Sequence, residues 1–146
     1  MTDHTTYSVA DWTGTLDGLK VQGLADGDDA VMVSRDGEAG SRQVGVSGDS
    51  VFSQSMSRAA TITLKLLVHS PTHRRLMQKY GVQQSGAKVP AFPFSCKNLG
   101  TGEGGSSTSC SIVGVPDLTE GATAGTRTWT LSAGEWRPLI PTEATA

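Results

Sequence analysis

The sequence predicts a mainly β protein: an antiparallel β-sandwich or small barrel with one flanking α-helix at about 70–80. Of its 146 residues, 18 are glycine and 33 are serine or threonine, and these residue types are poor in helix interiors. Several short segments alternate apolar and polar side chains between turn residues, as half-buried strands do. Only one segment opens with a helix-capping pair. The length suits a single domain spanning residues 1–146.

The N-terminal part is expected to contain short strands. The assigned segments are a loose N-terminus at 1–5 and strands at 6–12, 14–24 and 30–36. Thr13-Gly14 is interpreted as the turn between the first two strands, and Gly18 as a bulge or a close approach. In the third strand, Val31 and Val33 share one face.

Residues 37–59 form the least regular segment. Val44 and Val46 alternate with glycine, and Ser47-Gly48-Asp49 predicts a turn before a second extended stretch. We therefore expect a long excursion loop with strand-like arms. A loop of this length inside a compact domain is uncommon and often functional.

The strand at 61–68 is the clearest in the chain, and it leads directly into the predicted helix. Its apolar face alternates strictly and comprises Ile62, Leu64, Leu66 and Val68. Ser70 is a good N-cap, and Pro71 follows at the first helical position, where its missing N–H costs nothing. The helix is expected to run to about Tyr80 and to end at Gly81. Its apolar stripe comprises Leu76, Met77 and Tyr80.

The C-terminal part is expected to alternate between strands and glycine-rich turns. The assigned segments are an extended stretch at 89–99, a flexible hairpin tip at 100–108, strands at 109–115 and 126–133, a loop at 116–125 and a loose tail at 141–146. Pro90 and Pro93 indicate a sheet edge or a bulge in the extended stretch. In the last strand, Trp129 and Leu131 are predicted to point inward.

The two cysteines, Cys96 and Cys110, are each seven residues from Glu103, so they face each other if the hairpin is centred there. Directly opposed residues have Cβ atoms about 4.5–5.5 Å apart, which is slightly wide for a disulfide. Three interpretations stay open: two buried thiols, a bridge within the chain, or a bridge between neighbouring copies.

Two sequence patterns of enzymes occur in the chain, but without the structural context that each requires. Gly100, Gly102 and Gly105 fit the glycine pattern of dinucleotide sites, but a β-type segment follows where a helix should receive the phosphates. Residues 85–88 fit Ser-x-x-Lys without the companion motifs of that enzyme class. The sequence therefore predicts no catalytic residue, no cofactor and a protein that is not an enzyme.

Metal-ligating patterns are also weak. His69 and His73 are separated by a Ser-Pro pair and do not share one helix face. Asp26, Asp28 and Asp29 lack the helix-flanked loop and terminal glutamate of a calcium site, and a solvated acidic turn is expected instead. No metal site is predicted.

The charge distribution excludes a generally basic nucleic-acid binder, because the net charge is −2. Residues 1–58 carry 9 acidic and 4 basic side chains, net −5, whereas residues 59–146 carry 5 acidic and 8 basic ones, net +3. Such a division suits contact across a repeated interface, with ordinary surface scatter as the alternative. The opening residues lack the apolar region of a signal peptide and no apolar run could span a membrane, so assembly in a cytosol without membrane contact is expected.

Three segments, taken in order, resemble a family of bacteriophage structural proteins: GLADGDDAVMVSRDGEAGSRQVGVSGDS, SRAATITLKLLVHSPTHRRL and AFPFSCKNL. Over roughly residues 5–115 the chain looks like a tail tube protein of phages with contractile tails. Such proteins are similar to the tubes of type VI secretion systems and bacteriocins.

The resemblance implies a structural virion protein that forms the inner tail tube from stacked hexameric rings, as a conduit for genome ejection. It implies a two-faced strand that packs on its own core and faces a lumen or a neighbour, and a helix on the outward side. It also makes the excursion at 37–59 the candidate contact between rings, through residues Arg42, Val44, Val46, Asp49 and Phe52.

The implied partners are further copies of the chain, the tail sheath protein, and baseplate and tail-terminator proteins. The tape measure protein and DNA would occupy the lumen without specific binding, since a basic bore would hold phosphates and slow ejection. The expected location is the virion tail, assembled in the host cytoplasm.

Three alternative interpretations compete with this one. An isolated β-sandwich binding module would present exposed aromatic side chains, but the 8 aromatic residues are few and the tryptophans are spread along the chain. A small hydrolase would need a partnered histidine, and only three histidines occur. A baseplate-proximal tube paralogue would share the fold and differ in copy number.

Overall fold

The computed structural model describes residues 7–26 and 29–141, so the predicted loose N-terminus at 1–5 and residues 142–146 of the predicted tail lie outside the described residues. The described elements are η1 (Val9–Asp11), β1 (Trp12–Leu16), β2 (Leu19–Lys20), β3 (Val31–Arg35), β4 (Gly40–Val44), β5 (Ser50–Gln54), β6 (Ala60–Leu67), α1 (Pro71–Gln84), β7 (Phe92–Asn98), β8 (Gly104–Gly114), β9 (Thr126–Ala133) and β10 (Arg137–Leu139). The strand pairings among them are antiparallel, as predicted.

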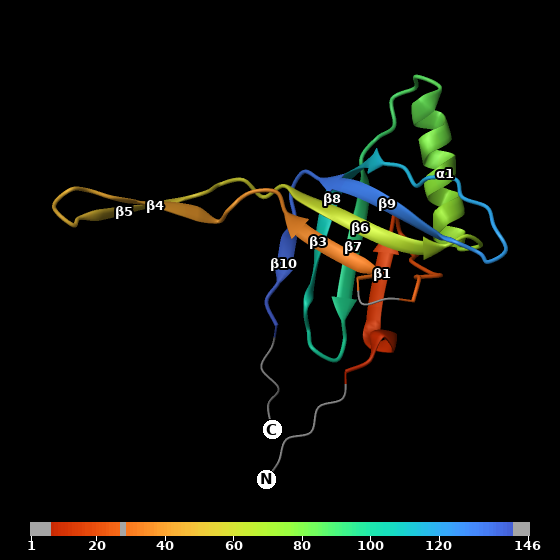
Figure 1. Cartoon of the computed structure of the whole chain (residues 1–146), viewed down its shortest axis with the longest axis horizontal. Coiled ribbons are helices and arrows are strands. Elements are labelled where there is room, and N and C mark those ends of the chain that lie inside the picture. The colour runs from red at the N-terminus through yellow and green to blue at the C-terminus, as the bar shows by residue number, and fades with distance from the viewer. Residues whose placement is uncertain (1–6, 27–28, 142–146) are drawn as a thin grey trace, which may run out of the picture.

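The main sheet folds over itself into two layers. Its strand order is β2-β1-β7-β8-β9-β6-β3, with β10 paired to β8. The long strand β8 connects the layers, because its residues 104–107 pair with β7 and its residues 110–114 pair with β9, while Cys110 pairs with both. Residues 104–106 of β8 also pair with β10. In Figure 1, β3, β6 and β9 cross in front of β1 and β7. The end strands β2 and β3 do not pair with each other, so the fold is sandwich-like and not a closed barrel.

The core lies between the two layers and takes alternate residues from each strand. In β6, Ile62, Leu64 and Leu66 are fully buried, as the alternation predicts. Trp129 and Leu131 of the neighbouring β9 are also fully buried. Burying one large apolar side chain contributes about 1.5–3 kcal/mol. The other main core residues are Leu16, Val21, Leu76, Phe92, Phe94, Cys96, Cys110 and Ile112.

Helix α1 begins where the sequence predicts and ends four residues later. The Ser70 side chain accepts a hydrogen bond from the backbone N–H of His73 at 3.4 Å, which caps the first turn. The predicted stop at Gly81 is wrong, because an exposed glycine inside a helix costs only about 1 kcal/mol and the helix continues to Gln84. The break follows near Gly86, whose φ of 90° does not fit a right-handed helix.

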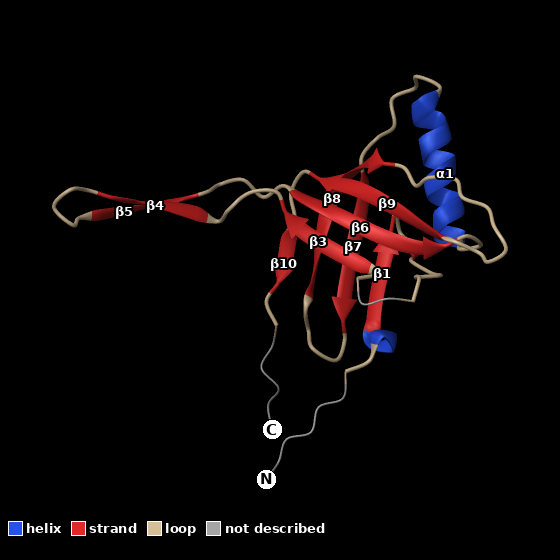
Figure 2. Cartoon of the chain, in the orientation of Figure 1, coloured by secondary structure: helices blue, strands red, loops and turns tan. Residues whose placement is uncertain are grey.

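The predicted apolar stripe of α1 is divided between two environments. Leu76 is fully buried and Tyr80 packs against the core, whereas Met77 is 43% exposed. On the same helix, Lys79 Nζ lies 2.7 Å from Asp17 Oδ2 in the turn after β1. The helix therefore flanks the sheet (Figure 2) through its inner face, and Met77 is not part of that contact.

The first hairpin turns at Asp17-Gly18 and not at the predicted Thr13-Gly14. Asp17 and Gly18 have φ values of 55° and 80°, which a two-residue hairpin turn requires and an Asp-Gly pair favours. Gly14 instead lies within β1, where a Cβ would lie 2.4 Å from the Trp12 ring. Gly18 therefore forms the turn itself, and the prediction of a bulge there is wrong.

The glycine run after β7, which the sequence predicts to be a flexible tip, is in large part strand. Gly104 and Gly105 already belong to β8. A Cβ on Gly104 would lie 2.2 Å from the carbonyl oxygen of Cys96, and one on Gly105 would lie 2.5 Å from the Trp136 ring. Close packing, and not flexibility, explains these two glycines.

The register of β7 and β8 separates the two cysteines. Cys96 pairs with Gly105 and Cys110 pairs with Phe92, so the predicted opposition of the cysteines is wrong. The turn explains this register. Asn98 Oδ1 accepts hydrogen bonds from the backbone N–H groups of Gly100, at 2.9 Å, and Thr101, at 3.2 Å. These bonds centre the hairpin nearer residue 100 than residue 103. The partner position of Cys110 is four residues from Cys96 along β7, about 13 Å, which is too far for a bridge within the chain.

Strand β7 is an inner strand, flanked by β1 and β8, so the predicted sheet edge is wrong. The alternative prediction of a bulge is confirmed, because the register against β8 shifts between Phe92 and Phe94. Pro93 lies at that shift, where its missing N–H leaves no ladder position unfilled.

Strands β4 and β5 form a separate two-stranded sheet that projects from the body (Figure 1). Gly40 pairs with Gln54 and Val44 pairs with Ser50, and Gly48, with φ of 91°, lies in the tip. The excursion predicted at 37–59 is thus a β-hairpin whose turn lies where the sequence places it. Residues 40–54 are called the hairpin arm below.

Candidate interaction surfaces

The hairpin arm presents large apolar side chains to solvent. Phe52 is 53% exposed and Val44 is 68% exposed. A two-stranded hairpin alone is at best marginally stable in water, and grouped exposed apolar side chains mark interaction surfaces. The apolar side chains exposed on the arm and just after it are Val44, Val46, Val51, Phe52 and Met56.

Three of the predicted contact residues share one face of the arm. Arg42 pairs directly with Phe52, and Val44 follows two residues along the same strand. The guanidinium carbon of Arg42 lies 5.5 Å from the Phe52 ring centroid, which is a cation–π contact, and its Nη1 donates to Ser50 Oγ at 3.0 Å. A Cβ on Gly40 would lie 2.4 Å from Phe52 Cζ, so the ring rests against the glycine.

The other two predicted contact residues lie at the tip. Val46 is fully exposed, and the Asp49 carboxylate accepts a hydrogen bond from Ser47 Oγ at 3.3 Å. The structure therefore carries all five predicted residues on one arm. Val51 and Met56 are not among the predicted contact residues, although an apolar side chain within a serine-rich run is a signal that could have identified them.

The base of the arm contacts the body on both sides. The Arg35 guanidinium donates to the carbonyl of Ser57. Glu135 pairs with Arg137 at 3.0 Å and with Arg58 at 3.3 Å. These cations, Arg137 foremost, hold the pKa of the Glu135 carboxyl below its usual value. The arm is therefore tied to the segment before β10.

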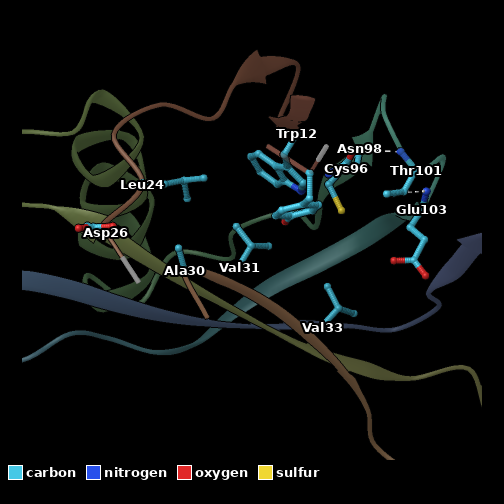
Figure 3. Close-up of a pocket in the computed structure, with 12 residues that line it drawn as sticks. Trp12, Leu24, Asp26, Ala30, Val31, Val33, Cys96, Asn98, Thr101 and Glu103 are labelled. Carbon is cyan, nitrogen blue, oxygen red and sulfur yellow. Dashed lines mark hydrogen bonds between the residues drawn. The ribbon is translucent and has the colours of Figure 1, made fainter. Parts of the chain in front are cut away.

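A groove opens between β3 and the opposite layer of the sandwich (Figure 3). Two cavities of about 540 and 450 Å³ adjoin there, and both are lined by Val33, Glu103 and Gly104. The first cavity is also lined by Trp12, Leu24, Val31 and Cys96, and the second by Arg35, Arg58, Trp136 and Leu139. We call this recess, apolar within and charged at its rim, the β3 groove.

Both cysteines are buried free thiols, Cys96 at 8% exposure and Cys110 at 0%. Burial raises the pKa of each thiol, so neither is a reactive thiolate near neutral pH. A bridge between copies, which stays a prediction, would have to use Cys96, because Cys110 does not reach the surface.

Two of the residues considered for metal binding have other partners. Nδ1 of His73 accepts a hydrogen bond from Trp129. Asp29 pairs with Lys65 at 2.7 Å, and this contact lowers the pKa of the carboxyl. Asp28 lies outside the described residues. Among residues 7–26 and 29–141, no group of three or more histidine, cysteine or acidic side chains could hold a metal ion.

The glycine pattern at Gly100, Gly102 and Gly105 spans the β7–β8 turn and the start of β8, and a strand follows it. A phosphate would therefore meet no helix N-terminus at this place. Within the part of the chain that the structure describes, no helix is long and apolar enough to cross a membrane.

Comparison with known proteins gives one family and a group of similar structures. The family model described as bacteriophage PhiTE tail tube protein matches residues 4–139. No curated protein matches the chain.

Solved structures from contractile injection systems share the fold. A sheath/tube terminator of the extracellular contractile injection system PVC, in its extended state, has a TM-score of 0.66 and 14% identity, covering 95% of this chain and 100% of that one. The tube terminating cap of the anti-feeding prophage AFP has a TM-score of 0.63 and 13% identity, covering 94% and 93%. The extended PVC sheath–tube complex contains a chain with a TM-score of 0.59 and 15% identity, covering 92% and 93%.

Proposed function

Because the chain belongs to the bacteriophage PhiTE tail tube protein family, we propose that it forms the inner tail tube of a phage particle from stacked hexameric rings. The family is one of structural tail tube proteins and not of enzymes, so the chain is a component of a phage-like tail. The tube would be the conduit through which the genome leaves the particle.

The hairpin arm is the observation that carries the proposal. It extends from the body (Figure 1), and its apolar and charged side chains have no partner among the described residues outside the arm itself. In a monomer, the exposed side chains of Phe52 and Val44 would add no stability to a hairpin that is itself only marginally stable. Contact with another copy would cover these side chains, and we assign the arm to the contact between rings through Arg42, Val44, Val46, Asp49 and Phe52.

The ends of the main sheet support lateral assembly. β2 and β3 each have one unpaired edge in the described chain, and unpaired edges accept further strands. Joining the edges of adjacent copies within a ring would satisfy these backbone groups. Sheets joined in this way would surround a lumen, with α1 outside.

The proposed partners follow from the same arrangement. The tail sheath would surround the tube, as the similar PVC structure is of a sheath–tube complex. Baseplate and terminator proteins would close its two ends. The tape measure protein and DNA would occupy the lumen without specific binding, and assembly would take place in the host cytoplasm.

Negative-stain electron microscopy of the purified protein at low and high concentration tests the proposal. Rings or hollow tubes are expected, and compact monomers at every concentration would contradict it. Arg42→Glu is expected to raise the protein concentration at which tubes form while leaving the circular dichroism spectrum unchanged. Arg74→Glu, a reversal at an exposed position of α1, serves as the matched control and is expected to leave tubes intact.

A tube-end protein is the second candidate. Two of the three structures described above are a terminator and a terminating cap, and their TM-scores exceed that of the tube-complex chain. A tube-end paralogue near the terminator or the baseplate would form single rings that do not elongate at any concentration, which the same micrographs distinguish from tubes. A carbohydrate-binding module is less favoured, because Trp129 is fully buried and Trp12 and Trp136 pack against the core.

A further inference from the structure

Two apolar surfaces of this chain differ in shape. The hairpin arm is a protrusion with Phe52 and Val44 on one face. The β3 groove is a recess whose two cavities adjoin at Val33 and Gly104. Figure 3 shows Trp12, Leu24 and Val31 grouped around the first cavity. A protruding apolar surface and a receding one on the same chain are complementary in form.

Each surface also carries a charge beside its apolar part, and the two signs are opposite. On the arm, the guanidinium carbon of Arg42 lies 5.5 Å from the Phe52 ring centroid. On the groove, Glu103 is exposed on the wall that both cavities share. Arg35 and Arg58 also line the second cavity, but Arg58 is paired with Glu135 and Arg35 donates to the carbonyl of Ser57. Glu103 makes no ion pair with the described residues. Complementary charges of this kind fix the register of an interface.

The geometry points to the β3 groove as the receptor for the hairpin arm of a second copy of this chain. Phe52 enters the apolar part of the groove, and Arg42 pairs with Glu103. This assignment rests on the proposed function, and it adds the receiving surface, which membership of the family does not specify.

The arm of a chain does not occupy that chain's own groove. Arg35 and Arg58, at the base of the arm, line the second cavity, and the arm extends away from the body (Figure 1). The contact is therefore heterologous, because each copy offers its arm to one neighbour and its groove to another. Heterologous contacts close into rings or continue as filaments, as a tube requires.

Charge reversal on each surface tests the pairing. Arg42→Glu leaves the groove unchanged, and Glu103→Arg leaves the arm unchanged. Each single variant is expected to raise the protein concentration needed for assembly by at least about tenfold, since each places like charges together. Asp117→Arg, in the exposed loop between β8 and β9, reverses an acidic residue away from the groove and is expected to assemble like the wild type.

Recovery of assembly by combining the two charge reversals is the decisive test of the pairing. The double variant Arg42→Glu with Glu103→Arg is expected to assemble again, because the reversed arm meets a reversed groove. An equimolar mixture of the two single variants is also expected to assemble. The arm of each variant then meets a groove of opposite charge on the other variant. Sedimentation and electron microscopy measure both outcomes.

The outcomes separate this inference from the proposed function. Tubes formed by Glu103→Arg at wild-type concentrations would overturn the inference and leave tube formation standing, with another segment in the groove. Failure of both the double variant and the mixture, with folded proteins by circular dichroism, would also overturn the pairing. A wild-type chain that stays monomeric in analytical ultracentrifugation at every concentration would overturn both.

Discussion

The indole N–H of Trp129 donates a hydrogen bond to Nδ1 of His73 at 2.9 Å, and the bond joins the buried centre of β9 to the first turn of α1. The two ring centroids lie 5.8 Å apart. Because Nδ1 accepts this bond, the neutral imidazole carries its proton on Nε2. The neutral histidine is the form that fits the structure.

Acidification is expected to weaken this protein through His73. Burial, and then the nearby Arg127 guanidinium, lower the pKa of the imidazole. A histidine with a lowered pKa binds its proton more readily in the unfolded state, so stability falls as the pH drops through and below the unfolded value of about 6.5. Thermal unfolding between about pH 8 and pH 5 measures the effect as a falling Tm.

A glutamine at position 73 provides the control for that experiment. The His73→Gln side chain retains an acceptor for the indole N–H and does not titrate. Its Tm is expected to change less over the same pH range than that of the wild type. Equal slopes for the two proteins would show that His73 does not set the pH dependence.

Gly104→Ala is expected to destabilise the fold by about 1–3 kcal/mol through overpacking. The added Cβ would lie 2.2 Å from the carbonyl oxygen of Cys96, a backbone atom that cannot rotate away. Gly121→Ala is the matched control, because no atom lies within 4 Å of its added Cβ. Urea unfolding of both variants tests the difference, and equal midpoints would contradict the packing role of Gly104.

Gly81→Ala is expected to have the opposite effect. Gly81 lies inside α1, and a Cβ there meets nothing within 4 Å. Alanine favours a helix interior over glycine by about 0.8–1 kcal/mol, which corresponds to a rise in Tm of roughly 2–4 °C for a domain of this size. A lower Tm would show that the helix ends before this residue.

Both cysteines are expected to remain thiols in the purified protein. Their separation along β7 and β8 prevents a bridge within the chain, and burial raises the pKa of both groups. Intact mass spectrometry after alkylation under denaturing conditions is expected to show two added groups without prior reduction. In the folded protein, Cys96 at the groove is expected to react before Cys110, and the reverse order would contradict the assigned burial.

Much of the fold could be predicted from local patterns. The period-two alternation of Ile62, Leu64 and Leu66 predicts both the strand and its buried face, because a strand's geometry alone turns successive side chains to opposite sides. Ser70 predicts the start of α1 because a cap acts within one turn. The turn at Ser47-Gly48-Asp49 likewise depends on neighbouring residues, so the excursion and its turn could be predicted, whereas its five candidate contact residues rest on the family resemblance.

Other features depend on atoms distant in the sequence. Gly104 is a strand residue because the backbone of Cys96 lies against it, whereas glycine alone indicated a flexible tip. Asn98 centres the hairpin and so decides which residues oppose the cysteines. The division of the α1 stripe, with Leu76 inside and Met77 outside, follows from where the sheet lies beneath the helix.

The sequence by itself determined the β character of the chain, its single helix, the clearest strand faces and the projecting arm, because each arises from steric and hydrogen-bonding preferences of adjacent residues. Only the tertiary structure decided the strand order and the β3 groove. That groove brings Val33 beside Glu103, seventy residues along the chain. Such a surface exists only once the two layers pack, since packing and not local preference brings distant side chains together.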